Sequence, residues 1–311
     1  MNLNHNMKKI CTYLVFLSMA LACSSCKKSG DATKSGSGDT IKITNTVKKP
    51  FNIYGFIVYS GYVQNGANVN ASYAQIQQYL LAFGIKKLNL LYENKLLDYP
   101  NGDMANGIPN THRIDSLANQ ALADPSTLVS FDLEGWNRFD TTVTPARMIT
   151  VIKDFKKTNT VSPVGLYATV PQNTYGYSAT TKSTYDKYNK GYASVAAQVD
   201  YFSPSLYNYN GVDSVAWKNA AAYNVQACNL YGFTSKKITP YITPEVTVNG
   251  VTTVLSYNDM LLRLQALYNL GADGCFVWTS SSTRDANGNK IYVDVTTGWA
   301  KAIVDFIAAH R

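Results

Sequence analysis

The sequence predicts an α/β fold, namely a parallel (β/α) barrel of the TIM type with seven strands. Strand-like and helix-like segments alternate from residue 51 to the C-terminus, which is the order of repeated βα units. The strand-like segments are short and mostly apolar on both faces, as buried parallel strands are. The first one runs into Tyr59-Ser60-Gly61-Tyr62, without the Gly-rich phosphate turn of an open dinucleotide-binding sheet. Seven units in about 260 residues therefore favour a barrel.

Each expected strand is rich in β-branched or aromatic residues, and each expected helix has apolar residues at helical spacing. Pro145 suits the first turn of its helix, and Gly84 and Gly271 suit the ends of theirs. The expected strands are 51–59, 87–93, 128–134, 164–170, 199–207, 238–243 and 274–280, and the expected helices are 71–83, 113–123, 145–157, 183–197, 214–230, 257–270 and 297–309.

The N-terminal part has the layout of an export signal. Lys8 and Lys9 precede an apolar run over residues 10–22, which is too short for a transmembrane helix and fits a signal peptide. The small residues and cysteines after it resemble a bacterial lipoprotein signal, with Cys26 (or Cys23) as the lipidated residue. An ordinary signal peptide with incidental cysteines is the alternative. We expect an exported bacterial lipoprotein of the cell envelope, held to the membrane by a lipid anchor.

Three regions follow from this reading: a lipoprotein signal peptide at 1–26, a flexible tether at 27–49, and a single barrel domain at 50–311. The tether consists of Lys, Gly, Ser, Thr and Asp with almost no large apolar side chain, so it cannot bury enough surface to fold. In the barrel only Cys228 and Cys275 remain, too few for a disulfide framework. We expect both to be buried free thiols.

The distribution of charge argues against a nucleic-acid partner. The chain carries a formal charge of +8, but residues 1–49 hold eight Lys and two Asp. Residues 50–311 hold twenty basic and eighteen acidic side chains. Because the barrel domain is nearly neutral, it lacks the basic surface that a nucleic-acid binder needs.

The third expected strand ends in two acids at alternate positions, Asp132 and Glu134. Alternate residues leave the same face of a strand, and two nearby carboxylates raise one pKa. A carboxylic acid that stays protonated near neutral pH can protonate a glycosidic oxygen. The bland alternative is a solvated strand end with two unrelated acids.

Aromatic residues gather at the other expected strand ends, as Tyr167, Tyr175, Tyr177, Tyr207 and Trp278. Tyr and Trp offer flat apolar faces to sugar rings and a polar group to their hydroxyls. The alternative is that they only plug the mouth of the barrel.

Other chemistries find little support. Beyond the signal peptide the sequence holds only His112 and His310, which disfavours a Ser-His-Asp triad or a multi-histidine zinc site. No phosphate-binding loop or zinc motif is present, so we expect neither a cofactor nor a metal. His112 suits a capping or surface role at a helix start.

These residues resemble the hyaluronidase family of glycoside hydrolases, of the venom and mammalian type. The similarity follows the order of the barrel domain along nearly its whole length. It is most specific in the acid motif Phe131-Asp132-Leu133-Glu134-Gly135-Trp136 and in the last strand, from Gly271 to Ser281. Pro204-Ser205-Leu206-Tyr207 and Asn106-Gly107-Ile108-Pro109 resemble further family segments.

The resemblance implies a retaining, substrate-assisted cleavage of β-linked N-acetylhexosamine glycans. Glu134 matches the proton donor, and Asp132 matches the acid that orients the substrate N-acetyl group. Tyr207 matches a tyrosine near that group, Trp278 matches the tryptophan under the sugar, and Tyr175 or Tyr177 matches a further site tyrosine. Trp278-Thr279-Ser280 departs from the family's Trp-Gly-Ser, the paired cysteines of the animal enzymes are absent, and the near-neutral body argues against hyaluronan itself.

Two alternatives remain at this stage. A chitinase-like endo-N-acetylglucosaminidase would need acids where this chain has Thr127 and Ser130. A non-catalytic glycan-binding lipoprotein on the same barrel would not need the pair Asp132 and Glu134.

Overall fold

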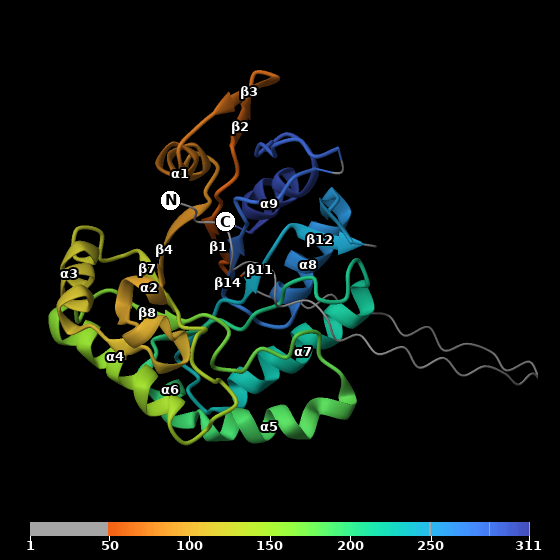
Figure 1. Ribbon diagram of the computed structural model, residues 1–311. Helices are drawn as coiled ribbons and strands as arrows, with labels where there is room; N and C mark the ends of the chain where they lie inside the picture. Colours follow the sequence, from red (N-terminus) through yellow and green to blue (C-terminus); the bar gives the residue numbers. More distant parts are fainter. Residues whose placement is uncertain (1–48, 249, 286, 311) are drawn as a thin grey trace, which may run out of the picture. The chain divides into compact units, whose positions relative to one another are not determined.

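The computed structural model describes residues 49–248, 250–285 and 287–310. Its centre is a curled parallel sheet in the order β11-β14-β1-β4-β7-β8 (Figure 1). The predicted parallel α/β fold is therefore confirmed as a curled sheet of six strands. These strands are β1 (Asn52–Phe56), β4 (Lys86–Tyr92), β7 (Leu128–Asp132), β8 (Val164–Leu166), β11 (Tyr241–Ile242) and β14 (Gly274–Trp278).

A separate parallel pair, β9 (Tyr201–Phe202) and β10 (Lys237–Ile238), lies between the two ends of this sheet. Isolated bridges join Tyr167 to Ser203 and Ser205 to Tyr241. The strands expected over 199–207 and 238–243 are thus shorter and interrupted. Their interruptions contain Pro204 and Pro240, and proline has no N–H to donate to a strand ladder.

Helices surround the strands (Figure 1). Gly84 and Gly271, beyond the ends of α1 and α8, have the positive φ angles (85° and 88°) expected of glycine helix caps. Pro145 lies in the first turn of α4, as predicted. The helices are α1 (Tyr73–Leu81), α3 (Thr111–Ala121), α4 (Thr144–Thr158), α5 (Lys182–Gly191), α6 (Ala193–Gln198), α7 (Ser214–Leu230), α8 (Tyr257–Asn269) and α9 (Gly298–Ala309).

The helix expected over 183–197 is divided into α5 and α6 at Tyr192. The break follows Gly191, and glycine is unfavourable inside a helix. His112 lies exposed in the first turn of α3, where the side chain of Asn110 caps the helix instead.

The connections after the strands carry short elements that the sequence analysis did not predict. One hairpin turns at Asn65 and Gly66, both at positive φ (53° and 76°), which is the conformation that favours an Asn-Gly hairpin turn. The added elements are the hairpins β2 (Gly61–Gln64) with β3 (Ala67–Asn70) and β12 (Glu245–Val248) with β13 (Val251–Val254), the strand pair β5 (Leu97–Asp98) with β6 (Ile108–Pro109), the short helix α2 (Glu93–Leu96), and 3₁₀ turns at Pro100–Gly102, Met104–Asn106 and Ala179–Thr181.

The core has two parts, because alternate strand residues face opposite sides of the sheet. The first part contains Ile53 and packs under the helices. The buried free thiols Cys228 and Cys275 belong to this part. The second part, which we call the inner cluster, is built from strand and strand-end residues and lies on the other face. It comprises Leu88, Leu90, Tyr167, Ala168, Tyr201, Tyr241 and Phe276, flanked by Tyr54, Phe56, Tyr92, Leu128, Tyr207 and Trp278.

Tyrosine fills much of the inner cluster because neighbouring positions make room for it. A Cβ at Gly165 would lie 2.3 Å from the ring of Tyr201, so only glycine fits there. The Tyr201 hydroxyl donates to the Val129 carbonyl at 2.8 Å, which satisfies a polar group inside an apolar cluster.

The expected signal peptide, the lipidated cysteine and nearly all of the tether lie outside the described residues. Within the described part of the chain, no helix is both long and apolar enough to cross a membrane.

Candidate active site

The carboxyl ends of the parallel strands bring the predicted acids and aromatic residues to one edge of the sheet. Asp132 ends β7 and lies in register with Tyr92 at the end of β4. Trp278 ends β14 and lies in register with Phe56 at the end of β1. Parallel strands place such residues together because all their carboxyl ends point the same way.

Asp132 is the less exposed member of the acid pair. Burial, together with the negative charges of Glu134 and Glu93, raises its pKa to about 7 against the opposing positive charge of Arg138. Its Oδ1 atom is buried and accepts no hydrogen bond from the described residues. A carboxyl group in such surroundings keeps its proton near neutral pH. The sequence predicted one raised pKa in the pair, and the structure assigns it to Asp132.

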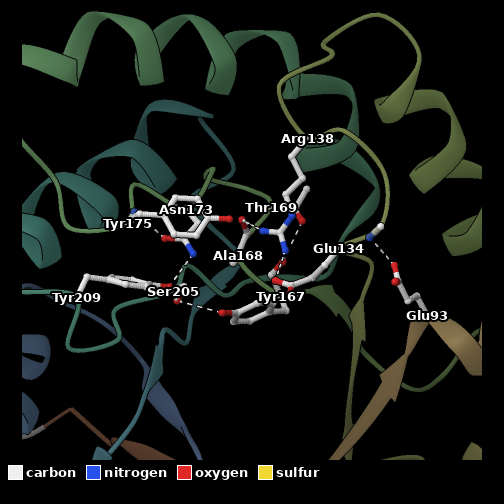
Figure 2. Close-up of polar contacts among 11 residues, drawn as sticks. Glu93, Glu134, Arg138, Tyr167, Ala168, Thr169, Asn173, Tyr175, Ser205 and Tyr209 are labelled. Carbon is white, nitrogen blue, oxygen red and sulfur yellow. Dashed lines mark hydrogen bonds and ion pairs between the residues drawn. The ribbon is translucent and has the colours of Figure 1, made fainter. Parts of the chain in front are cut away.

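Glu134 lies two residues beyond the end of β7, with a side chain that is 52% exposed. Its carboxylate forms an ion pair with Arg138, as Figure 2 shows. Arg138 is 7% exposed, donates to the Ala168 carbonyl at 3.0 Å, and places its guanidinium 5.7 Å from the centre of the Tyr167 ring. Arg138 therefore connects the exposed acid to the inner cluster. Arg138 was not predicted as a site residue, although it is the only basic side chain between β7 and α4.

A third carboxylate, Glu93, supports the loop between β7 and α4 that carries Glu134, which we call the acid loop. It is buried and accepts the backbone N–H of Gly135 at 2.6 Å (Figure 2). A Cβ at Gly135 would lie 3.0 Å from a Glu93 carboxylate oxygen and 2.9 Å from the Met104 carbonyl oxygen, so the loop depends on glycine here. The sequence analysis included Glu93 only as the end of a strand.

The loop after Glu134 is fastened by its tryptophan. The indole N–H of Trp136 donates to the Gly107 carbonyl at 3.0 Å in a buried position. The guanidinium of Arg147 lies 5.9 Å from the Trp136 ring centre and donates to the Ala105 carbonyl at 3.1 Å. These contacts fix the loop that carries both Glu134 and Arg138.

An aromatic floor continues from the acids across the inner cluster. Trp278 stacks on Tyr207 with ring centres 5.6 Å apart and an interplanar angle of 24°. Tyr207 also lies 5.8 Å from the Tyr167 ring, and the Trp278 indole N–H donates to the Tyr92 hydroxyl at 3.2 Å. Tyr92 pairs in register with Asp132, and burial, together with the negative charges of Asp132 and Glu134, raises the pKa of Tyr92.

A chain of hydroxyl contacts holds this floor in place. The hydroxyl groups of Tyr167 and Ser205 lie 3.3 Å apart, and those of Ser205 and Tyr209 lie 2.8 Å apart. Asn173 then donates to the Tyr209 hydroxyl at 2.7 Å (Figure 2). Because burial raises the pKa of Tyr167, Tyr207 and Tyr209, these hydroxyls remain protonated donors.

The structure separates the two tyrosines that the sequence left as alternatives. Tyr175 is 55% exposed and lines a cavity with Glu134. Tyr177 instead stacks on Tyr223, 4.5 Å away, and packs against the core beneath the helices. Tyr175 and Gly176, which precede Tyr177 in this loop, both have positive φ angles (47° and 86°).

The cavity beside Glu134 has a volume of about 350 Å³ and opens between the acid loop and the loop after β8. Its charged members, Glu134 and Arg138, neutralise each other. The described residues contain no group of three or more His, Cys, Asp or Glu side chains arranged to hold a metal ion. The residues lining the cavity are Glu134, Gly135, Trp136, Asn137, Arg138, Phe139, Gln172, Asn173 and Tyr175.

Comparison with known proteins gives structural matches only. No family model matches the sequence, and no curated protein sequence matches it. Bee venom hyaluronidase superposes with a TM-score of 0.50 and 18% identity, over 74% of this chain and 91% of the hyaluronidase. An endo-1,4-β-D-mannanase from Thermotoga petrophila gives a TM-score of 0.49 and 14% identity, over 84% of this chain and 86% of the mannanase. The chain therefore shares the fold of bee venom hyaluronidase, and the resemblance found in the sequence is confirmed at the level of the fold.

Proposed function

We propose that the protein is a glycoside hydrolase that cleaves β-linked N-acetylhexosamine glycans by a retaining, substrate-assisted mechanism. The observation that carries this proposal is the position of Asp132. Its carboxyl group has a pKa of about 7 and lies beside Glu134 at the strand ends, next to an aromatic floor suited to sugar rings. The fold shared with bee venom hyaluronidase agrees with this reading.

In the proposed mechanism, Asp132 holds a proton up to about neutral pH and supplies it to Glu134. The exposed Glu134 passes the proton to the glycosidic oxygen and later accepts one from water. The substrate acetamido oxygen attacks the anomeric carbon, in place of the second carboxylate used by most glycosidases. Asp132, now ionised, orients the acetamido N–H and stabilises the positive charge that develops on that group.

The surrounding residues complete these roles. Arg138 stabilises the carboxylate that Glu134 becomes after it has given up its proton. The Tyr207 hydroxyl, kept protonated by burial that raises its pKa, donates to the acetamido group. Trp278, stacked on Tyr207, supports the apolar face of the sugar. Tyr175 contacts the next sugar along the cavity.

We further propose that β9 and β10 close the curled sheet into a barrel with seven strand positions. The bridges from Tyr167 to Ser203 and from Ser205 to Tyr241 support this, because they connect the β9 segment to both neighbours. For localisation we propose export as a bacterial envelope lipoprotein, anchored through Cys26 (or Cys23) and separated from the membrane by the tether.

The activity is tested with the full chain, purified in detergent and incubated with glycans that contain β-linked N-acetylhexosamine. We expect reducing ends to be released, and Glu134→Gln to lower the rate at least about 100-fold, as removal of a general acid does. Asp140→Asn is the matched control, since Asp140 lies in the same loop but is bound to Thr142 and the α4 N-terminus. A wild type that binds these glycans as well as Glu134→Gln does, and cleaves none, would instead identify a glycan-binding protein.

A further inference from the structure

The end of the sheet that carries the candidate site has an excess of acidic side chains. The segments that join each parallel strand's carboxyl end to the next long helix, taken with Asp132, hold ten acidic and four basic side chains. Two further bases near the starts of α3 and α4, Arg113 and Arg147, reach this end but do not line the cavity. The domain as a whole is slightly basic, so this is a local excess of negative charge. The acids are Glu93, Asp98, Asp103, Asp132, Glu134, Asp140, Asp213, Glu245, Asp285 and Asp294, and the bases are Lys95, Arg138, Arg284 and Lys290.

The four bases offer little to an anionic ligand in the cavity. Arg138 lines the cavity but is paired with Glu134 and donates to Ala168. Arg284 donates to the carbonyls of Ser281 and Thr283 and forms a β-bridge with Lys290 in the segment after β14. Neither Arg284, Lys290 nor Lys95 lines the cavity.

The remaining cavity lining is neutral and suited to hydroxyl groups. Asn137 presents an exposed amide, and Phe139 and Tyr175 present exposed aromatic rings. The amides of Gln172 and Asn173 are buried and already donate to the Thr169 carbonyl and the Tyr209 hydroxyl. A carboxylate drawn into this cavity would lose water without gaining a free cation, and it would approach through a negative potential. An uncharged sugar would meet the Asn137 amide and the faces of two aromatic rings.

From this we infer that the substrate is an uncharged glycan, and that the strand-end face rejects polymers containing uronic acids such as hyaluronan and chondroitin. The inference rests on the proposed function, because it concerns the charge of the glycan at that same site. Rejection comes from repulsion and from the lack of a free cation among the described residues that line the cavity. A site discriminates in this way against a ligand that it could otherwise accommodate.

The test uses one polymer in two charge states. Native hyaluronan is compared with carboxyl-reduced hyaluronan, in which each uronate has become a neutral sugar while the linkages are unchanged. Binding to the full chain of the inactive Asp132→Asn variant, which keeps the ion pair between Glu134 and Arg138, is measured at low ionic strength. We expect at least roughly tenfold tighter binding of the reduced polymer, and we expect added salt to narrow the difference by improving the binding of native hyaluronan. Equal binding, tighter binding of native hyaluronan, or no binding of the reduced polymer would overturn the inference.

Cleavage by the wild type separates this inference from the proposed function. Selective binding of the reduced polymer without cleavage of any glycan would refute the hydrolase and leave the charge selection standing. Cleavage of native hyaluronan at least as fast as the reduced polymer would leave the hydrolase standing and refute the charge selection.

A single added cation gives a second measurement. Phe139→Lys places an ammonium group at an exposed position in the cavity lining. We expect it to narrow the binding preference roughly fivefold, the effect of one unit charge about 4 Å from another in water. Val143→Lys is the matched control, because Val143 has the same 47% exposure as Phe139 and lies outside the cavity lining. An equal effect of both substitutions would contradict a local role of the cavity charge.

Discussion

Asp132→Asn should stabilise the protein at neutral and alkaline pH while it abolishes the proposed activity. The substitution keeps the shape of the side chain and removes its ability to ionise. Asp132 has a folded-state pKa raised from 3.8 to about 7 by burial and by the charges of Glu134 and Glu93, partly offset by Arg138. Because this pKa is raised, the stability linked to the neutral carboxyl is fully present below pH 3.8 and is lost as the pH rises to 7.

The magnitude follows from that shift of about three pKa units. At about 1.4 kcal/mol per unit, ionised Asp132 costs the folded state about 4 kcal/mol above pH 7. The cost should be about 0.6 kcal/mol at about pH 4 and about 2 kcal/mol at about pH 5.5. A few kcal/mol is a large part of the roughly 5–15 kcal/mol by which domains are usually stable.

The assay is urea unfolding of wild type and Asp132→Asn at several pH values from about 4.5 to about 8.5, a range that brackets the raised pKa, followed by circular dichroism. The difference in unfolding free energy should increase with pH and level off above the folded-state pKa of about 7. Asp140→Asn serves as the control of opposite sign, since hydrogen bonds from Thr142 and Val143 lower the pKa of Asp140. A difference between wild type and Asp132→Asn that stays constant over this pH range would refute the reasoning.

Two further substitutions probe the loop that carries Glu134. Arg138→Met should lower kcat/KM roughly 10- to 100-fold, since a hydrogen bond to a charged group contributes about 1.5–3 kcal/mol. It should also move the pH profile of kcat/KM to higher pH, because Arg138 opposes the raised pKa of Asp132. A folded Arg138→Met variant with an unmoved profile would contradict this coupling. Arg138→Lys, which keeps the positive charge, should retain part of the coupling. Gly135→Ala should lower the unfolding free energy by about 1–3 kcal/mol in urea, as overpacking does, because its Cβ would meet the Met104 carbonyl oxygen at 2.9 Å. A Gly135→Ala variant as stable as wild type would mean that the acid loop moves to accept the added methyl group without any loss of unfolding free energy.

The sequence predicted the parallel fold because its strands are continuous apolar runs separated by helical patterns. The predictions failed where one or two residues alter the backbone locally. Pro204 and Pro240 interrupt two expected strands. Asn65-Gly66 is a typical hairpin turn, but the hairpin that it forms was not predicted. Both signals were present in the sequence, so these differences could have been anticipated.

The candidate site was only partly accessible from sequence. The spacing of Asp132 and Glu134 predicted one raised pKa in the pair, but burial decides which acid has it, and burial is a property of the folded chain. Glu93 reaches Gly135 from 42 residues away, and no local pattern reveals such a contact. Tyr175 and Tyr177 could not be distinguished from sequence, because only the folded loop exposes Tyr175 at the cavity and packs Tyr177 against the core.

The floor of the candidate site is made of the same residues that pack the interior of the sheet, since Tyr167, Tyr207 and Trp278 all belong to the inner cluster or its edge. Substitutions at these positions that adapt the site to a new sugar would also change the stability of the fold. The lip of the cavity is different, because Phe139 and Tyr175 are exposed on loops. Adaptation to new glycans should therefore accumulate at the lip, and a mutant library should lose soluble protein at the floor positions long before it does so at Phe139 or Tyr175.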